Sequence, residues 1–324
     1  MDKATISRNL DQVLKATDFP WLGERRQGKV RDIYAQPDKL ILIATDRHSS
    51  FDRIIAHIPF KGQVLNQISA FWFEETKDIV PNHVLAIPDP NVIVGKKCRV
   101  IPLEMVARGY MSGVTGTSLW MNYQKGQRNF GSFTLPDGMK KNQKLDRPVL
   151  TPTTKSDEHD RPVSPKEILE LGIVSNELWE KMEKATLALF ERGQKIAVER
   201  GLILVDTKYE FGLDENGELT LVDEIHTPDS SRYWQAGSYA ERFGKGEEPE
   251  YFDKEFLRLW FKEHCDPYND PVLPAAPPEM VAELSRRYIE IYETITGLKF
   301  ETDLTTPLAE RIRQNLASFA VPTN

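Results

Sequence analysis

Apolar residues in the first hundred positions recur with the pattern of a small sheet. Residues 28–34 and 39–45 are rich in β-branched and apolar side chains and flank a Gln-Pro-Asp turn, which predicts a β-hairpin. Residues 92–101 repeat this pattern after a helical stretch near residues 66–75, and a short helix is expected at residues 6–14. The first hundred residues are therefore expected to form a β-rich lobe.

Two helices are predicted after the middle of the chain. Ser164 and Glu167 have the spacing of a capping box, and Gly172 closes the short helix that they begin. Ser175 begins a longer helix, in which apolar residues recur at three- and four-residue steps until Gly201. The apolar stripe of this longer helix predicts that it packs on a sheet.

A second hairpin and a helical tail complete the pattern. Residues 202–213 and 218–225 predict two strands around the turn sequence Asp-Glu-Asn-Gly. From residue 253 to the end the pattern is helical, with a proline-rich break at residues 267–278. The polar, proline-containing stretch 124–165 is typical of binding loops.

Composition narrows the class of protein. Of the 324 residues, 40% are hydrophobic and 28% charged, which is typical of a globular chain. Two cysteines far apart argue against a disulfide framework or a zinc site, and no apolar run of about 18 residues could span a bilayer. The net charge of −7 without a basic run disfavours nucleic acid. We expect a cytoplasmic protein that binds small molecules and neither nucleic acid nor membrane, and a monomer is compatible with the sequence.

The second hairpin carries the most informative charges. Period-two alternation places Asp206, Lys208 and Glu210 on one face of the strand. If the turn pairs Leu213 with Glu218, then Lys208 faces Asp223 and Glu210 lies diagonal to Asp223. Two converging carboxylates next to a lysine are typical of a Mg²⁺ and phosphate site, and a solvated, salt-bridged face is the alternative.

Other polar blocks offer phosphate chemistry. Gly28 permits close approach, and Lys29 and Arg31 supply cations, although no Walker A loop is present and an edge strand with surface charges is the alternative. Residues 108–113 combine a guanidinium with small hydroxyl residues, which suits a phosphate monoester unless the segment is a flexible linker. Lone histidines such as His226 are more often structural than catalytic.

Six blocks in order carry a resemblance to a known family. Together they closely resemble the SAICAR synthetases of purine synthesis, over about residues 28–234, and six ordered motifs are far more specific than one. The blocks are GKVRDIY (28–34), TDRHSSFD (45–52), EMVARGYMSG (104–113), TPTTKSDEHD (151–160), LVDTKYEFG (204–212) and VDEIHTPDSSRYW (222–234).

The resemblance implies a two-lobed α+β fold related to ATP-grasp and kinase-like nucleotide folds, with ATP in a cleft between the lobes. Residues 1–101 would form the β-rich nucleotide-binding lobe, and residues 102–324 an α+β lobe with the metal and substrate sites and the helical tail. By the same resemblance, Glu210 and Asp223 would bind Mg²⁺. The residues implied at ATP are Gly28, Lys29, Arg31 and Lys208 at the phosphates, and Val100 and Glu104 at the adenine.

The resemblance also assigns a substrate end to the second lobe. Lys208 and Arg232 would be catalytic. After the RGYxxG block this chain has Val114 where the family commonly has a serine, so Ser112 or Thr115 would supply the hydroxyl group of that serine. The residues implied at the imidazole nucleotide are Arg108, Ser112, Thr115, Asp229, Ser231 and Arg232, and the candidates for the aspartate or nucleotide end are Lys155, His159 and Asp160.

The implied reaction joins carboxyaminoimidazole ribonucleotide (CAIR) to L-aspartate and splits ATP into ADP and phosphate. Phosphorylation of the CAIR carboxylate would give an acyl phosphate, which the amine of aspartate attacks, so positioning and charge neutralisation suffice for catalysis. Two alternatives are a small-molecule kinase or other ATP-dependent ligase and a catalytically silent nucleotide sensor.

Overall fold

The computed structural model of the chain describes residues 1–51, 53–114, 116–155, 161–252 and 255–321. The chain divides into two compact units. The first unit comprises residues 1–71, 84–97 and 252–324, and the second comprises residues 72–83 and 98–251. Each unit has its own sheet.

A five-stranded antiparallel sheet forms the centre of the first unit. The predicted hairpin is confirmed by the pairing of Arg31 with Ala44 through Ala35 with Leu40. The strand before it was missed, because its sequence Glu-Arg-Arg-Gln has no apolar alternation and lies mostly exposed. In spatial order the strands are β1 (Glu24–Gln27), β2 (Arg31–Ala35), β3 (Lys39–Ala44), β7 (Val92–Lys96) and β6 (Val84–Asp89).

Helices and a small sheet complete the first unit. The predicted helix at 6–14 is wrong in extent: α1 ends at Arg8, and the main chain of Leu14 instead bonds to Asp46. The elements are the two-stranded sheet of β4 (Arg47–Ser50) and β5 (Arg53–His57), the helices α1 (Lys3–Arg8), α7 (Glu255–His264), α8 (Pro278–Thr296) and α9 (Leu308–Asn315), and the 3₁₀ turns η1 (Pro20–Leu22) and η2 (Ala317–Phe319). Helix α2 (Lys61–Glu75) begins in the first unit, and its last residues belong to the second.

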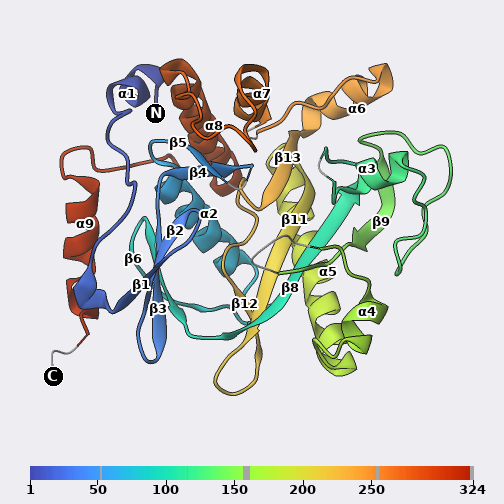
Figure 1. Cartoon of the computed structure of the whole chain (residues 1–324), viewed down its shortest axis with the longest axis horizontal. Coiled ribbons are helices and arrows are strands. Elements are labelled where there is room, and N and C mark those ends of the chain that lie inside the picture. Colours follow the sequence, from blue (N-terminus) through green and yellow to red (C-terminus); the bar gives the residue numbers. More distant parts are fainter. Residues whose placement is uncertain (52, 115, 156–160, 253–254, 322–324) are drawn as a thin grey trace. The chain divides into compact units, whose positions relative to one another are not determined.

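The helical tail packs in the first unit, whereas the sequence analysis assigns it to the second lobe. Helix α9 lies beside β6 (Figure 1), where the Arg311 guanidinium donates to both Asp89 carboxylate oxygens at 3.0 Å. Ser285 of α8 donates to the Pro59 carbonyl at 2.8 Å. These contacts come from residues more than 200 positions apart, which local sequence patterns do not reveal. The division at residues 97 and 98 lies close to the expected boundary after 101.

A six-stranded sheet forms the second unit, with two long strands side by side at its centre (Figure 1). The strand predicted at 202–213 is confirmed as β11 (Leu202–Leu213). The strand predicted at 92–101 is two strands, and the second, β8 (Arg99–Tyr110), continues through Arg108, so the flexible-linker alternative for this arginine is wrong. Smaller strands flank this pair: β9 (Lys144–Leu150), β10 (Thr153–Thr154), β12 (Leu219–Val222) and β13 (Ser231–Gln235).

The predicted helix caps of the second unit are confirmed. Ser164 and Glu167 form a complete capping box at the start of α4 (Pro165–Glu170), and the Ser175 hydroxyl caps α5 (Asn176–Glu199). The apolar face of α5 packs on β8 and β11, as expected from its periodicity. The remaining helices are α3 (Leu119–Gln124) and α6 (Ala236–Lys245).

The two faces of the central sheet differ in chemistry. A Cβ placed on Gly109 would lie 2.7 Å from the Gln194 amide of α5, so position 109 of β8 faces this helix. Because neighbouring side chains on a strand point to opposite faces, Arg108 and Glu104 point away from α5. Register pairs these two residues with Asp206 and Glu210 of β11. The face turned away from α5 therefore carries the charged residues.

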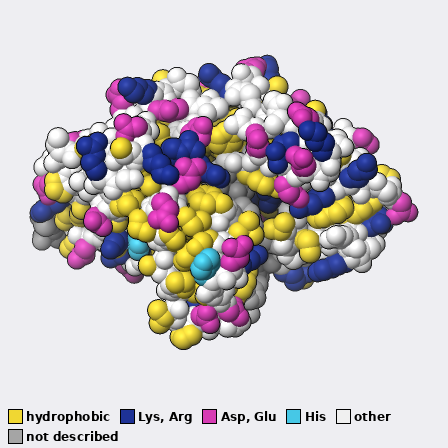
Figure 2. Space-filling model, turned by 90° about the horizontal axis from the view of Figure 1, so that it is seen from above, with side chains coloured by type: hydrophobic (Ala, Val, Ile, Leu, Met, Phe, Trp, Pro, Cys, Tyr) yellow, Lys and Arg dark blue, Asp and Glu magenta, His cyan; other side chains and the backbone are white. Residues whose placement is uncertain are grey.

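Surface charge is mixed on the side of the molecule drawn in Figure 2. Acidic and basic side chains are interspersed there, with hydrophobic side chains between them. In the part of the chain that the structure describes, no helix is both long and apolar enough to cross a bilayer. Cys98 and Cys265 are both free thiols.

Candidate active site

The second hairpin differs from its expected register by one residue. Leu213 pairs with Leu219 rather than Glu218, so β12 ends at Val222 opposite Glu210. An extended chain would then point Asp223 to the other face. Instead Asp223 leaves the strand in the left-handed region, with φ of 67°, and its charge acts on Lys208. Asp223 thus acts on Lys208 although the register differs from the expected one.

Glu104, Lys208 and Glu210 form an ion-pair cluster across β8 and β11. The Lys208 ammonium donates to Glu104 Oε1 at 2.6 Å and to Glu210 Oε1 at 2.8 Å. Lys155 pairs with the other oxygen of Glu210, and Thr153 donates to Glu104 Oε2 at 3.0 Å. The Glu210 side chain is only 5% exposed, whereas the Lys208 and Lys155 side chains are 30% and 45% exposed, so the salt bridges of this face enclose a buried carboxylate.

The carboxylates of the acid–lysine cluster act on Lys208 from several sides. Burial alone would lower the pKa of the Lys208 ammonium, but the charges of Glu210, Glu104 and Asp223 outweigh burial and raise this pKa above its ordinary value. The carboxylates of Glu104, Glu210 and Asp223 all act on Lys208, and Glu210 also pairs with Lys155. Such a cluster suits a bound cation.

The donor set also limits which metal fits. Among the described residues no group of three or more histidine, cysteine or acidic side chains is arranged around one metal position. A transition-metal cage is therefore a poor fit for these residues. Hard carboxylate oxygens in small number fit Mg²⁺, which is held by one or two carboxylates with phosphate oxygens and water.

Arg108 and Arg232 meet at one carboxylate farther along the same face. Asp206 Oδ2 accepts from Arg232 Nη1 at 2.7 Å and from Arg108 Nη1 at 3.4 Å. Arg232 Nη1 also donates to Ser112 Oγ at 3.0 Å, and Arg108 Nε donates to Thr151 Oγ1 at 2.7 Å. Two guanidinium groups and two hydroxyls therefore converge at this arginine pair.

The arginine pair places a second cation next to the buried Arg108. Burial lowers the pKa of Arg108, Asp206 raises it, and Arg232 lowers it again, with a net lowering. A guanidinium stays protonated in proteins, so the lowered pKa of Arg108 means that its positive charge is less stable here than in water. An anion that binds here stabilises that charge, and bidentate guanidinium geometry suits a phosphate.

Residues 28–31 form a turn and strand start in the first unit. Gly28 and Lys29 lie in the turn between β1 and β2, and Arg31 begins β2. The Lys29 side chain is exposed. The turn follows the edge strand β1, and the Gly28 and Lys29 carbonyls both accept from a buried arginine, Arg47.

The remaining predicted positions are only partly brought together. Val100 is 46% exposed at the start of β8. Ser231 bonds to Thr207 at 2.7 Å beside the arginine pair, and the Asp229 amide donates to Thr227 Oγ1 at 3.3 Å. Three predicted residues lie outside the described part of the chain: Thr115, His159 and Asp160.

Sequence reasoning missed the partners of the predicted cations. Asp206 was placed on the charged face without a role, and Glu104 was assigned to the adenine rather than to the acid–lysine cluster. Thr151 and Thr153 were seen only as part of a polar block. The pairing of β8 with β11 brings Asp206 opposite Arg108 and Glu210 opposite Glu104, and only this register reveals these roles.

His226 is a structural residue, as its sequence context suggests. Its ring is fully buried, bonds to the Tyr209 hydroxyl, and lies edge-on to Trp72 at 4.6 Å between ring centroids. Burial lowers its pKa to about 3. The imidazole is therefore neutral near pH 7. A Cβ on Gly193 of α5 would lie 2.4 Å from this ring, so His226 lies on the α5 face of the sheet.

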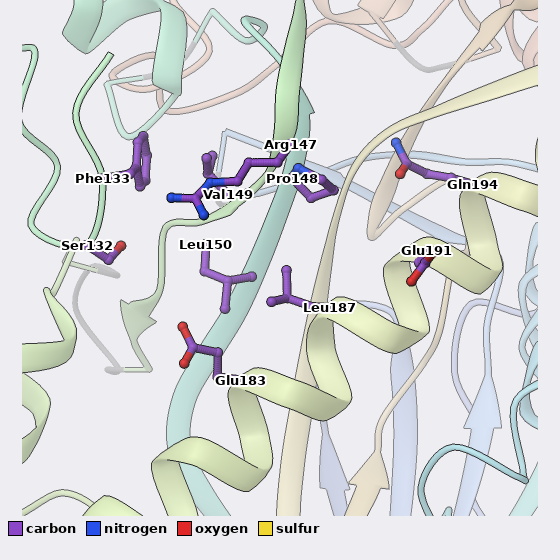
Figure 3. A pocket seen from close by; sticks show the side chains of 10 residues that line it. All are labelled: Ser132, Phe133, Arg147, Pro148, Val149, Leu150, Glu183, Leu187, Glu191 and Gln194. Carbon is purple, nitrogen blue, oxygen red and sulfur yellow. The ribbon is translucent and has the colours of Figure 1, made fainter.

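A cavity of about 500 Å³ lies on this other face, against α5 and β9 (Figure 3). Its charged lining residues are Arg147, Glu183 and Glu191. None of the predicted site residues lines it. The cavity therefore does not coincide with the charged face on which the acid–lysine cluster and the arginine pair lie.

Comparison with known proteins decides the family. A sequence profile of the SAICAR synthetase family matches residues 24–274. A phosphoribosylaminoimidazole-succinocarboxamide synthase of Legionella pneumophila (strain Paris) is 56% identical over 304 residues, which cover 94% of this chain and 97% of that protein. The chain belongs to the SAICAR synthetase family. A relative in Arabidopsis thaliana, named as the chloroplastic enzyme, is 55% identical over 316 residues, or 96% of this chain and 77% of that protein.

Solved structures of SAICAR synthetases share the fold. A SAICAR synthase from Saccharomyces cerevisiae complexed with SAICAR superposes with a TM-score of 0.77 at 33% identity, covering 89% of this chain and all of that one. A type-2 SAICAR synthetase in complex with ADP gives a TM-score of 0.65 at 27% identity, covering 86% and all of that chain. The predicted α+β fold of the SAICAR synthase type is confirmed.

Neutral, buried His226 makes the stability of the protein depend on pH. Its pKa of about 3 in the folded state lies below the unfolded value of 6.5, so the unfolded chain binds the proton more tightly. The contribution of neutral His226 to the free energy of unfolding is therefore fully present above pH 6.5 and is lost as the pH falls toward 3. Between pH 6.5 and 4.5 we expect the free energy of unfolding of the wild type to fall by about 2 kcal/mol more than that of His226→Gln, in urea titrations. Parallel pH profiles for the two proteins would contradict this.

Proposed function

We propose that the acid–lysine cluster, the arginine pair and the Gly28–Arg31 turn carry the activity of this family in this chain. The chain is an ATP-dependent carbon–nitrogen ligase, a phosphoribosylaminoimidazole-succinocarboxamide synthase. It joins CAIR to L-aspartate and forms SAICAR, ADP and phosphate in purine biosynthesis. The observation that supports the residue assignment is the placement of two oppositely charged clusters on one face of the sheet, through the pairing of β8 with β11.

The arginine pair suits the phosphate end of the imidazole nucleotide. Arg108 and Arg232 are held together by Asp206, and Arg232 also donates to the Ser112 hydroxyl. We assign the ribose and phosphate of CAIR to these groups. Because Val114 replaces the more common serine and is half exposed, the buried Ser112 is the described hydroxyl that we assign here.

The acid–lysine cluster suits the reacting phosphoryl group. Lys208 carries a firmly held proton, so it offers a permanent positive charge rather than a proton for transfer. We assign Lys208 to neutralise charge on the transferring phosphoryl group, and Gly28, Lys29 and Arg31 to the ATP phosphates. Lys155 neutralises Glu210 in the structure described here, and it would be released to a substrate carboxylate once another cation binds Glu210.

Glu210 and Asp223 fit Mg²⁺ by the hard carboxylate oxygens that they offer. The ion would supply charge neutralisation at the phosphate oxygens. The chain's own residues then need only hold the CAIR carboxylate in line with the phosphoryl group and the aspartate amine next to the resulting acyl phosphate. No side-chain nucleophile is required for this sequence of two displacements.

A kinase is the second candidate, since transfer of a phosphoryl group is common to both reactions. A synthetase requires both acceptors, whereas a kinase accumulates a phosphorylated acceptor without the amine. We expect ADP release by the purified chain only when CAIR and L-aspartate are both present, together with a new amide product detected by mass spectrometry. ADP release with CAIR alone, with a stable phosphorylated product, would favour a kinase, and no turnover at all would favour a nucleotide sensor.

The Glu210 carboxylate is the first test of the metal assignment. Glu210→Gln keeps the size of the side chain but removes the charge that holds Lys208 and, by proposal, Mg²⁺. We expect kcat/KM to fall about 100-fold, because the bound metal stabilises the transition state by several kcal/mol and the variant weakens one of its ligands. The Mg²⁺ concentration needed for half-maximal activity should rise for the same reason. Exposed Glu218 at the far end of the same hairpin provides the control, Glu218→Gln, which should behave as the wild type. Unchanged turnover of Glu210→Gln at low Mg²⁺ would refute the assignment.

Arg232 tests the nucleotide end. Arg232→Ala removes one charge-assisted bond, which is worth about 1.5–3 kcal/mol, so KM for CAIR should rise about tenfold or more. KM for ATP should change about twofold at most if Arg232 serves only the imidazole nucleotide. The control is Arg147→Ala on β9, which also removes one arginine charge but at an exposed position outside the arginine pair, and it should leave both KM values unchanged. Equal losses for CAIR and ATP would count against this division.

A cytoplasmic location stays a prediction, because the plant relative is chloroplastic by name.

A further inference from the structure

Arg47 is a buried arginine in the first unit that has no place in the assignments above. It begins β4, and its side chain is only 1% exposed. Its guanidinium donates to three main-chain carbonyls: Lys15 at 2.7 Å, Gly28 at 3.0 Å and Lys29 at 3.1 Å. A fourth bond, at 2.9 Å, goes to the Asp32 carboxylate. One side chain thus holds the turn that precedes β2.

The carbonyl groups of this turn all face the segment that contains Arg47. The Gly28 and Lys29 carbonyls accept from Arg47, and the Val30 carbonyl accepts from the Thr45 amide at 2.9 Å and its hydroxyl at 2.8 Å. No described peptide bond is cis, and the C=O and N–H of a trans peptide point in opposite directions. The N–H groups of Lys29 and Val30 therefore point away from Arg47.

Asp32 makes the burial of Arg47 possible. Its carboxylate lies fully buried in β2 and accepts from Arg47 and from the amide and hydroxyl of Thr17, at 2.6 and 2.9 Å. The ion pair is thus fully hydrogen-bonded, as a buried pair must be. Because the planar guanidinium fork spans several carbonyls at once, a lysine ammonium at this position could not hold the same set of bonds.

We propose that Arg47 is a positioning residue for ATP, which acts through the main chain of the Gly28–Val30 turn and does not itself touch the nucleotide. It holds the carbonyls inward, so that the outer edge of the turn presents N–H groups next to the cationic side chains of Lys29 and Arg31. Successive N–H groups next to cations favour an anion. This inference rests on the proposed function only in taking the turn as the phosphate-binding segment.

The test compares Arg47→Lys with a matched control, Arg53→Lys. Arg53 of β5 also donates to main-chain carbonyls in the first unit, those of Asp270 at 2.6 Å and Pro271 at 3.3 Å, but it holds a different segment. We expect Arg47→Lys to raise KM for ATP about tenfold, with KM for CAIR and aspartate unchanged and kcat within about threefold. Hydrogen exchange of residues 24–34 should become faster in the same variant. Arg53→Lys should show neither effect.

Three outcomes separate this inference from the proposed function. Lys29→Ala tests the turn: if KM for ATP is unchanged in this variant, the turn does not bind phosphate and the assignment beneath the inference fails. If Lys29→Ala raises KM for ATP and folded Arg47→Lys does not, or changes all three KM values alike, the inference about Arg47 alone is overturned. If Arg47→Lys shows no cooperative thermal unfolding, Asp32→Asn replaces it and must raise KM for ATP selectively, and an unchanged KM there would contradict the inference.

Discussion

The antiparallel pairing of β8 with β11 is the constraint on which the site depends. Its register places Glu104 opposite Glu210 and Arg108 opposite Asp206. Like charges directly opposite each other destabilise a sheet, so the two glutamates require a cation next to them. Lys208, two positions from Glu210 on the same face, donates to both glutamates and meets this requirement. The strand pairing and the ion cluster therefore stabilise each other.

Four residues farther along β8, two like charges again share one opposite charge, but here the like charges are positive. Here Arg108 and Arg232 repel each other, and Asp206 accepts from both. One carboxylate thus accepts from two guanidinium groups, whereas in the acid–lysine cluster one ammonium group donates to two carboxylates. Four strand residues span about 14 Å, the scale of a small nucleotide. At a separation that strand geometry fixes, the face thus carries the acid–lysine cluster, to which we assign the cation, and the arginine pair, to which we assign the phosphate of the nucleotide.

Local patterns predicted much of this arrangement, because period-two alternation and helix caps depend on neighbouring residues. Strand β11, the Ser164 capping box and the helix from Ser175 followed directly. The one-residue slip of the second hairpin did not follow from such patterns, and neither did the positive φ of Asp223, which comes after the slipped strand. Nor did the packing of α9 on β6, which depends on Arg311 and Asp89, 222 residues apart. The partners of charged residues that lie far apart in the sequence are therefore the main feature that local patterns do not predict.

The arrangement also explains how an acidic chain can serve anionic reactants. Its net charge of −7 describes the whole surface, whereas binding depends on charge within a few ångströms of the ligand. Lys208 and Arg108 are held on rigid strands beside carboxylates that fix their positions, so little reorganisation is needed when anions arrive. Neutral His226 lies on the opposite face and the raised pKa of Lys208 disfavours proton transfer. The described clusters are therefore suited to place and neutralise charges rather than to attack a substrate.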